Sequence, residues 1–151
     1  MLTKNEENKD MPVILERTFK SSIEKVWPAL TDIQQMRQWY FPQLNEFRPE
    51  RGFETQFDVH HEGTDWLHIW KIAEVAPLRR ITIEWKFGGH PGTSVLTFEL
   101  IPDGKRTKLR LTHSGLRSFM PEKHPGLAHE NFIKGWTQFM DEGLKEFLEK
   151  H

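Results

Sequence analysis

The chain has 151 residues, a length that fits one domain with a single hydrophobic core. Its 21 Lys and Arg residues nearly balance its 22 Asp and Glu residues, and the formal net charge is −1. No dense basic segment appears, which argues against a nucleic-acid partner, because such proteins carry clustered positive charge. The absence of cysteine excludes disulfides, thiol nucleophiles and zinc sites with sulfur ligands.

The first eleven residues are expected to form a disordered tail, because Leu2 is the one apolar residue that follows Met1 in the run MLTKNEENKD. This run lacks the apolar segment of a signal peptide, and no stretch approaches 18 apolar residues. We therefore expect a cytoplasmic protein without a membrane partner. Residues 12–151 would then form one domain.

The aromatic residues of the sequence are mostly Trp and Phe, the less polar kinds. The sequence holds six Trp and 11 Phe against one Tyr. Such large side chains must build either a large core or the walls of a cavity.

The first elements follow from alternation and capping signals. Apolar and polar residues alternate over 13–20, as in a half-buried strand. Ser21 with Glu24 three residues later forms a capping-box pattern, which predicts a helix there, and Pro28 predicts that it is kinked or short. Asp32 can cap a second short helix, which Pro42 would end.

The middle of the chain reads as strand after strand. Strands are predicted over residues 44–48, 53–60, 66–76, 80–87, 94–101 and 105–113, separated by short turns rich in Gly and Pro. The short connections predict an antiparallel meander with one polar, solvated face. Residues 66–76 are apolar at both alternating sets of positions. Either a bulge switches the phase of this strand, or both of its sides are covered, which would allow a homodimer contact.

A long amphipathic helix is predicted over residues 127–150, with Trp136, Met140 and Gly143 on its apolar half. Gly143 is costly inside a helix, so we expect either a close contact with the sheet or a void at this point. An antiparallel sheet and one long helix must bury their apolar faces against each other, giving an α+β fold in two layers. A curved sheet wrapped around a single helix leaves a space between them, which is the natural ligand site.

Several segments together resemble one known family. These are LERTF at 15–19, VWPALTD at 26–32, WYF at 39–41, RPERG at 48–52, LTHSGL at 111–116 and the pair Gly135-Trp136. In order and spacing they are similar to the activator of heat-shock protein 90 ATPase homologue family, which belongs to the START-like, or helix-grip, superfamily (SRPBCC). The resemblance spans roughly residues 12–150. It implies a helix-grip fold with a cavity between the C-terminal helix and the sheet. It does not fix the function, because the superfamily includes carriers, cyclases, hormone receptors and co-chaperone domains.

Candidate ligand-binding residues are those expected to face this space: Arg17, Trp39, Phe57, Trp70, Trp85, His113, Trp136 and Met140. His113 could hydrogen-bond a ligand or act as a base, or it could be a buried histidine with its own partners. Arg17 could hold a ligand carboxylate, or it could pair with a carboxylate such as Glu74. The aromatic residues and Met140 could line the space or simply pack as core.

No metal, cofactor or catalytic group is expected. The histidines lack the spacing of metal ligands, and there is no phosphate-binding glycine loop, dinucleotide motif or nucleophile elbow. We therefore expect a non-catalytic binding protein for a small, mostly hydrophobic molecule. Two alternatives stay open: a protein-binding regulator resembling the chaperone ATPase activator domain, with a chaperone as partner, and a cyclase- or hydrolase-like enzyme that uses the same cavity.

Overall fold

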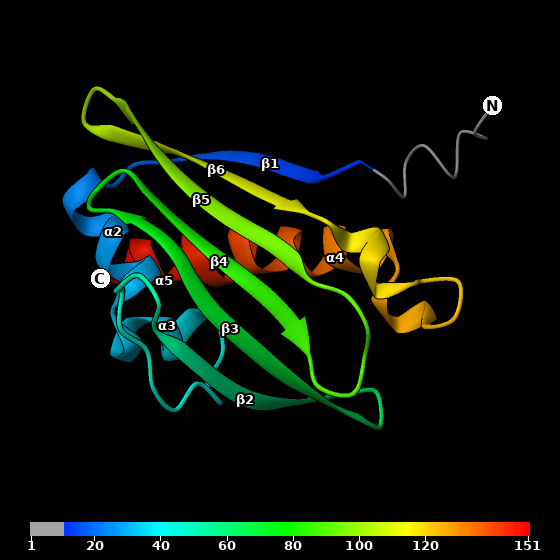
Figure 1. Cartoon of the computed structure of the whole chain (residues 1–151). Coiled ribbons are helices and arrows are strands. Elements are labelled where there is room, and N and C mark those ends of the chain that lie inside the picture. The colour runs from blue at the N-terminus through cyan, green and yellow to red at the C-terminus, as the bar shows by residue number, and fades with distance from the viewer. Residues whose placement is uncertain (1–10) are drawn as a thin grey trace.

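The computed structural model describes residues 11–151, so the predicted tail lies outside the described residues apart from Met11. Within this range the chain forms a strand, two helices, five further strands and a C-terminal helical segment (Figure 1). The bounds are β1 Val13–Phe19, α2 Ile23–Thr31, α3 Ile33–Trp39, β2 Glu54–His61, β3 Thr64–Ala76, β4 Arg80–Phe87, β5 Ser94–Asp103, β6 Arg106–Ser114, α4 His129–Gln138, η3 Phe139–Leu144 and α5 Lys145–Lys150. Two short 3₁₀ turns, η1 Leu116–Phe119 and η2 Pro125–Leu127, join β6 to α4.

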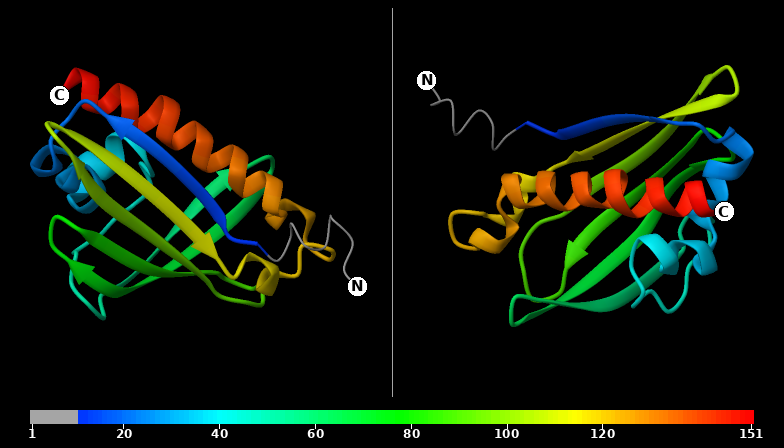
Figure 2. Two further views of the ribbon diagram at one scale, coloured as in Figure 1. Left: turned by 90° about the horizontal axis from the view of Figure 1, so that it is seen from above. Right: turned by 180° about the vertical axis from the view of Figure 1, so that it is seen from behind.

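The strands form one antiparallel sheet in the order β1-β6-β5-β4-β3-β2. Consecutive strands pair throughout, except that β1 lies at one edge beside β6. The C-terminal helical segment crosses one face of the curved sheet, and α2 and α3 lie on the same side near its end (Figure 2). The structure thus confirms the predicted α+β helix-grip architecture, in which the two apolar faces cover each other.

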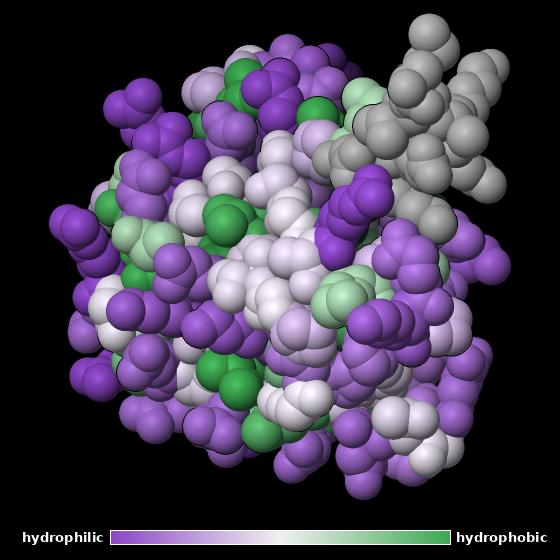
Figure 3. Space-filling view, turned by 45° about the vertical axis from the view of Figure 1, so that its right-hand side comes forward, coloured by the Kyte–Doolittle hydropathy of each residue, from purple (hydrophilic) through white to green (hydrophobic). Residues whose placement is uncertain are grey.

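Alternation along the strands decides which side chains face the helix. In β4 the four buried positions are Ile81, Ile83, Trp85 and Phe87, while Lys86 points outward. Figure 3, which views the outer face of the sheet obliquely, shows hydrophilic residues (purple) mixed with residues of intermediate hydropathy (white) and some hydrophobic ones (green). The predicted polar face is therefore present.

The phase of β3 changes at a bulge. The register shifts between Ile72 and Glu74, so that Ile72 pairs with Ile83 and Val75 pairs with Ile81. Ile72 and Val75 are three residues apart, yet both pack on the inner face, because one extra residue is accommodated between them. Of the two explanations offered by the sequence, the bulge is the one observed.

Residues 44–48 do not form the predicted strand. Leu44 and Phe47 are both buried, but they are three residues apart, and the segment lies between Pro42 and Pro49. Proline restricts both its own backbone and that of the residue before it. Leu44 and Phe47 are apolar because they pack onto the core, not because they belong to a strand. The described chain therefore has six strands where seven were expected.

The two short helices begin with different caps. The N-cap of α2 is Ser22, whose side chain makes no capping hydrogen bond, so the predicted capping box at Ser21 is wrong. The Ser22 carbonyl accepts the first helical hydrogen bonds, one residue later than expected. α2 passes through Pro28 and ends after nine residues, as a short helix. The prediction for Asp32 is confirmed, because its carboxylate accepts a hydrogen bond from the amide of Gln35 at the start of α3.

The long C-terminal helix is present but not uniform. α4 and α5 are joined by η3, a π-helical segment, and the three run on as one rod (Figure 2). Gly143 lies within η3, and a Cβ atom there would stand 2.7 Å from the carbonyl oxygen of Trp39. The close contact that the glycine permits is therefore with the end of α3, not with the sheet as expected.

Candidate ligand-binding site

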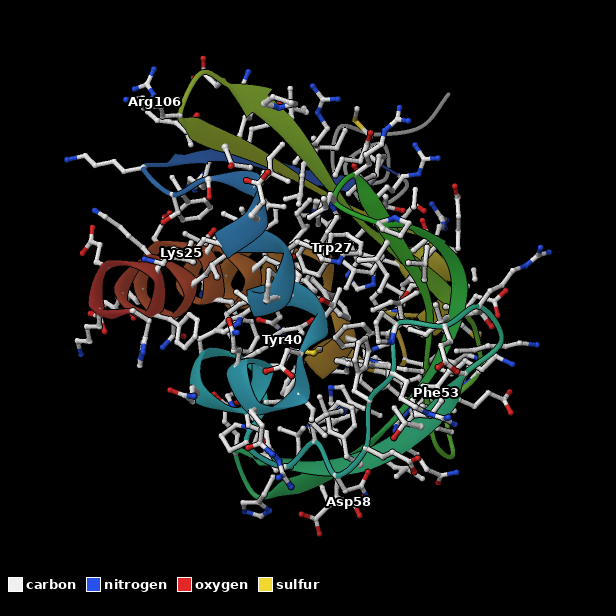
Figure 4. The ribbon with its side chains drawn as sticks, turned by 90° about the vertical axis from the view of Figure 1, so that its left-hand side faces the viewer. Lys25, Trp27, Tyr40, Phe53, Asp58 and Arg106 are labelled. Carbon is white, nitrogen blue, oxygen red and sulfur yellow. The ribbon has the colours of Figure 1, made fainter. Side chains whose placement is uncertain are left out.

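Tyr40 and Phe41 enter the space between helix and sheet directly after α3. The helix ends at Trp39, the amide of Tyr40 donates a hydrogen bond to the Met36 carbonyl at 2.8 Å, and Pro42 lacks the amide needed to extend the helix. Both aromatic side chains are buried. Figure 4 looks at the molecule from the end that α2 and α3 cover, with Tyr40 labelled near the middle.

The Phe41 ring lies within an aromatic cage. Its centroid is 4.3–6.2 Å from the centroids of six other rings, those of Tyr40, Phe57, His68, Trp70, Trp85 and Phe139. The sheet supplies four of them as cross-strand pairs, because Phe57 of β2 faces His68 of β3 and Trp70 of β3 faces Trp85 of β4. We call Phe41 and these six residues the aromatic cage.

Tyr40 connects the cage to the C-terminal helix. Its ring lies 5.7 Å from that of Trp136 and 4.9 Å from that of Phe139, and 5.8 Å from that of Trp70 on the sheet. The space that the sequence led us to expect as a cavity is therefore occupied by Tyr40 and Phe41. A ligand at this position must displace at least one of these two side chains.

Three polar atoms of the cage have no hydrogen-bond partner among the described protein atoms: the hydroxyl of Tyr40 and the indole nitrogens of Trp70 and Trp85. An indole N–H can only donate. Burial raises the pKa of the Tyr40 hydroxyl well above its usual value, so this group keeps its proton and can donate as well. Buried polar groups without partners are rare, and each costs about 1–3 kcal/mol of stability.

His113 is held by its own buried partners. The Trp136 indole N–H donates to Nδ1 at 3.0 Å, which leaves the proton of the neutral ring on Nε2, 2.7 Å from the Ser94 hydroxyl. Burial lowers the pKa of His113 to about 3, so the ring is neutral at pH 7. These bonds tie β6, β5 and α4 together. His113 is therefore a buried histidine whose two ring nitrogens are both paired, one with Trp136 of α4 and the other with Ser94 of the adjacent strand.

His68 is neutral for the same reason, because burial lowers its pKa to about 4, against a weaker opposing effect of its hydrogen bond to the Trp66 carbonyl. Among residues 11–151 the buried polar side chains are those of Thr31, His68, Ser94, Thr107 and His113. This part of the chain therefore buries no Lys, Arg, Asp or Glu side chain. The interior has no fixed charge that could balance a charged ligand group.

Arg17 does not reach the cage. Its guanidinium forms an ion pair with Asp141 of η3, with 2.6 Å between Nε and Oδ1, and both side chains are at least one-third exposed. This hydrogen bond holds the pKa of the Asp141 carboxyl below its ordinary value. The Glu74 partner suggested by the sequence pairs with Arg80 instead. Arg17 thus joins β1 to the C-terminal helix at the surface.

The other predicted site residues lie in the interior. Trp39, Phe57, Trp70, Trp85, His113, Trp136 and Met140 are each no more than 6% exposed. Sequence reasoning missed Tyr40, Phe41, His68 and Phe139. A signal existed for the first two, since three consecutive aromatic residues before a proline cannot all cover a helix face, and at least one must leave it.

Other candidate sites are less developed. One surface hollow lies among α2, α3 and α5, and another lies on the outer face of the sheet beside the β3 bulge. Neither is lined by a predicted site residue. Within the described range no three His, Cys, Asp or Glu side chains gather as a metal site would require. No helix of that range is both long and apolar enough to span a membrane.

The curved antiparallel sheet, the helical rod across its inner face and the two short helices after β1 define a protein of the START-like, helix-grip class. The chain belongs to the family described as activator of Hsp90 ATPase homolog 1-like protein, whose profile matches residues 20–149. The resemblance seen in the sequence is therefore confirmed. A comparison with curated proteins gave no match.

Solved structures share this fold. Protein MLL2253 from Mesorhizobium loti has a TM-score of 0.72 and 27% identity, covering 92% of this chain and 97% of that one. Protein CV1439 from Chromobacterium violaceum has a TM-score of 0.74 and 20% identity, covering 91% and 96%. DynU16, described as a putative protein in the dynemicin biosynthetic locus, has a TM-score of 0.72 and 20% identity, covering 93% of this chain and 48% of that one.

Proposed function

We propose that this protein is a non-catalytic, cytoplasmic binding protein for a small, mostly hydrophobic ligand, held between the C-terminal helix and the sheet. The observation that carries the proposal is the aromatic cage with three buried donors that have no protein partner. Core residues normally have their polar atoms paired, so unpaired donors on neighbouring side chains are a feature that a bound molecule would explain.

The walls of the cage suit a flat or apolar molecule. The Phe41 ring already makes six ring contacts there, in the tilted, edge-to-face arrangements that aromatic groups prefer. A ligand ring in the same place would find the same contacts. Binding would then exchange one buried aromatic group for another, and the hydrophobic cost of displacing Phe41 would be partly recovered from the ligand.

The segment that carries Phe41 is suited to such an exchange. Residues 41–51 contain no helix or strand, and the backbone hydrogen bonds that join this segment to β3 begin only at Gly52 and Phe53, so residues 41–51 can move without breaking the sheet. The Arg37 side chain donates to the Leu44 carbonyl at 2.6 Å and anchors the segment near α3. Beside it lies the π-helical segment η3, a rare geometry that often occurs at functional sites.

The proposal is tested by native mass spectrometry and thermal-shift screening of the purified protein against lipids and planar aromatic compounds. At least one compound should appear as a one-to-one adduct and raise the melting temperature. If no compound does either, the proposal is wrong.

A pair of variants locates the site. Phe41→Leu should bind an apolar hit more tightly, because less side chain must be displaced. Phe119→Leu shortens another buried ring, which lies outside the cage, against Phe87, and should leave the affinity unchanged. Equal effects of the two substitutions would place the ligand elsewhere.

A further inference from the structure

From the same three donors we infer the chemical class of the ligand: a neutral, planar molecule that carries at least one carbonyl-type oxygen, such as an aromatic ketone or quinone. This inference rests on the proposed function and narrows it. One carbonyl oxygen would accept hydrogen bonds from two of the donors of Tyr40, Trp70 and Trp85, and a second carbonyl oxygen would accept one from the third.

The unpaired groups of the cage are hydrogen-bond donors, so they require an acceptor on the ligand. The two indole N–H groups can only donate, and the tyrosine hydroxyl offers a proton as well. A ligand group that can only donate, such as an ammonium group, would leave these hydrogens unpaired. A carbonyl oxygen has two lone pairs and can pair two of these donors, so a quinone, with two such oxygens, can remove all three unfavourable burials.

The three side chains that carry the unpaired donors are neighbours in the structure. The rings of Trp70 and Trp85 lie 5.2 Å apart on adjacent strands, and the Tyr40 ring is 5.8 Å from that of Trp70. The three donors therefore belong to neighbouring groups, within reach of one small ligand. The rest of the cage consists of the rings of Phe41, Phe57 and Phe139 and the neutral imidazole of His68, which favour a flat, mostly hydrocarbon body around the oxygen.

The residues around the cage also bear on the charge of the ligand. A carboxylate would be an equally good acceptor, but an ionised group in an apolar interior needs a partner of opposite charge. His68 and His113 are neutral at pH 7, and Arg17 is held at the surface by Asp141. The cage therefore favours an uncharged acceptor over an anionic one.

The experiment compares molecules of nearly the same shape. Binding of 9-fluorenone, fluorene and 9-fluorenone-4-carboxylate is measured by tryptophan fluorescence titration and native mass spectrometry, with anthraquinone and anthracene as a second scaffold. The ketone and quinone should bind about tenfold or more tightly than the matching hydrocarbons, because even one or two buried hydrogen bonds account for that ratio. The carboxylate should bind more weakly than fluorenone by at least the same factor.

Variants then assign the donors. Tyr40→Phe, Trp70→Phe and Trp85→Phe should each lower the preference of anthraquinone over anthracene by about three- to tenfold, while anthracene binding persists. Trp27→Phe is the matched control, because this indole belongs to α2, outside the cage, and its loss should leave the preference unchanged.

The outcomes separate the two proposals. If hydrocarbon and ketone bind equally well, or if the carboxylate binds best, the inference about ligand class is overturned and the proposed function stands. If the preference persists in all three donor variants, the assignment of the donors is overturned. If no scaffold binds but a compound of the broader screen does, the inference about ligand class is overturned; if neither the scaffolds nor that screen gives a binder, the proposed function itself is rejected.

Discussion

Replacing Tyr40 with Phe should make the protein more stable, although it removes a polar group from a buried aromatic residue. The hydroxyl has no protein hydrogen-bond partner in the structure, so its removal breaks no bond. In the unfolded chain the same hydroxyl is hydrated, and burying it without a partner costs about 1–3 kcal/mol. The ring is unchanged in size, and its contacts with Trp136, Phe139 and Trp70 persist.

The expected gain is about 1–3 kcal/mol in the free energy of unfolding. For a domain of this size each kcal/mol corresponds to about 2–4 °C in melting temperature, so a rise of at least about 2 °C is expected. Urea unfolding followed by circular dichroism measures the free energy, and calorimetry measures the melting temperature.

Two tryptophans provide a matched comparison. The Trp39 indole N–H donates to the Ala29 carbonyl at 2.7 Å, whereas that of Trp70 has no protein partner. Both Trp→Phe substitutions remove the same atoms, but the Trp39 variant also loses a hydrogen bond and should be the less stable by about 1–3 kcal/mol.

Two results would contradict the absence of partners for these donors: a loss of more than about 0.5 kcal/mol in the free energy of unfolding of Tyr40→Phe, or equal stability of the Trp39 and Trp70 variants. Either result would mean that the donors of the cage are well paired in the free protein. The expected result, by contrast, links stability to function, because the same substitution that stabilises the free protein should weaken binding of a ketone.

Three further predictions concern the rest of the fold. Gly143→Ala should destabilise the protein by about 1–3 kcal/mol, because its Cβ would meet a backbone oxygen at 2.7 Å. Gly135→Ala should stabilise it by about 0.5–1 kcal/mol, because there is open space around that position. Thermal unfolding of both variants checks this, and a shift of the melting temperature in the same direction for both would contradict it. The folded pKa values of His113 (about 3) and His68 (about 4) lie below the unfolded value of about 6.5, so the unfolded state binds more protons as the pH falls, and stability should drop by roughly 2 kcal/mol per histidine between pH 7 and pH 5. Urea unfolding at both pH values should show about half of that loss in His68→Phe, and an unaltered loss would refute the assignment. Arg17→Ala should cost about 1 kcal/mol or less and leave ligand affinity unchanged, because its ion pair is exposed; a large loss of affinity in the titration would place Arg17 in the site.

Periodicity in the sequence predicted most of the architecture. Two local patterns carried this prediction: the alternation of buried and outward residues in β4, and the apolar face of the helix around Trp136. Each pattern requires that one face of its element be buried, whatever packs against it. A sheet and a helix with complementary apolar faces have few ways to pack, so the two-layer fold followed. The same logic failed at residues 44–48, where burial without alternation resembled a short strand.

Contacts between distant segments decided what the sequence left open. The bulge in β3 depends on how that strand pairs with β4, and the close approach at Gly143 depends on where α3 ends. The sequence indicated Trp70 and Trp85 as residues that line the interior, but not Tyr40. No local pattern tells whether an aromatic residue that follows a helix turns inward.

The sequence by itself determined the class of fold and the aromatic character of the interior, because both follow from patterns along single elements. The tertiary structure decided that Tyr40 and Phe41 occupy the space between helix and sheet and that three donors there lack protein partners. Hydrogen-bond pairing depends on distances between atoms that are far apart in the chain, and such distances are set by packing of the whole molecule.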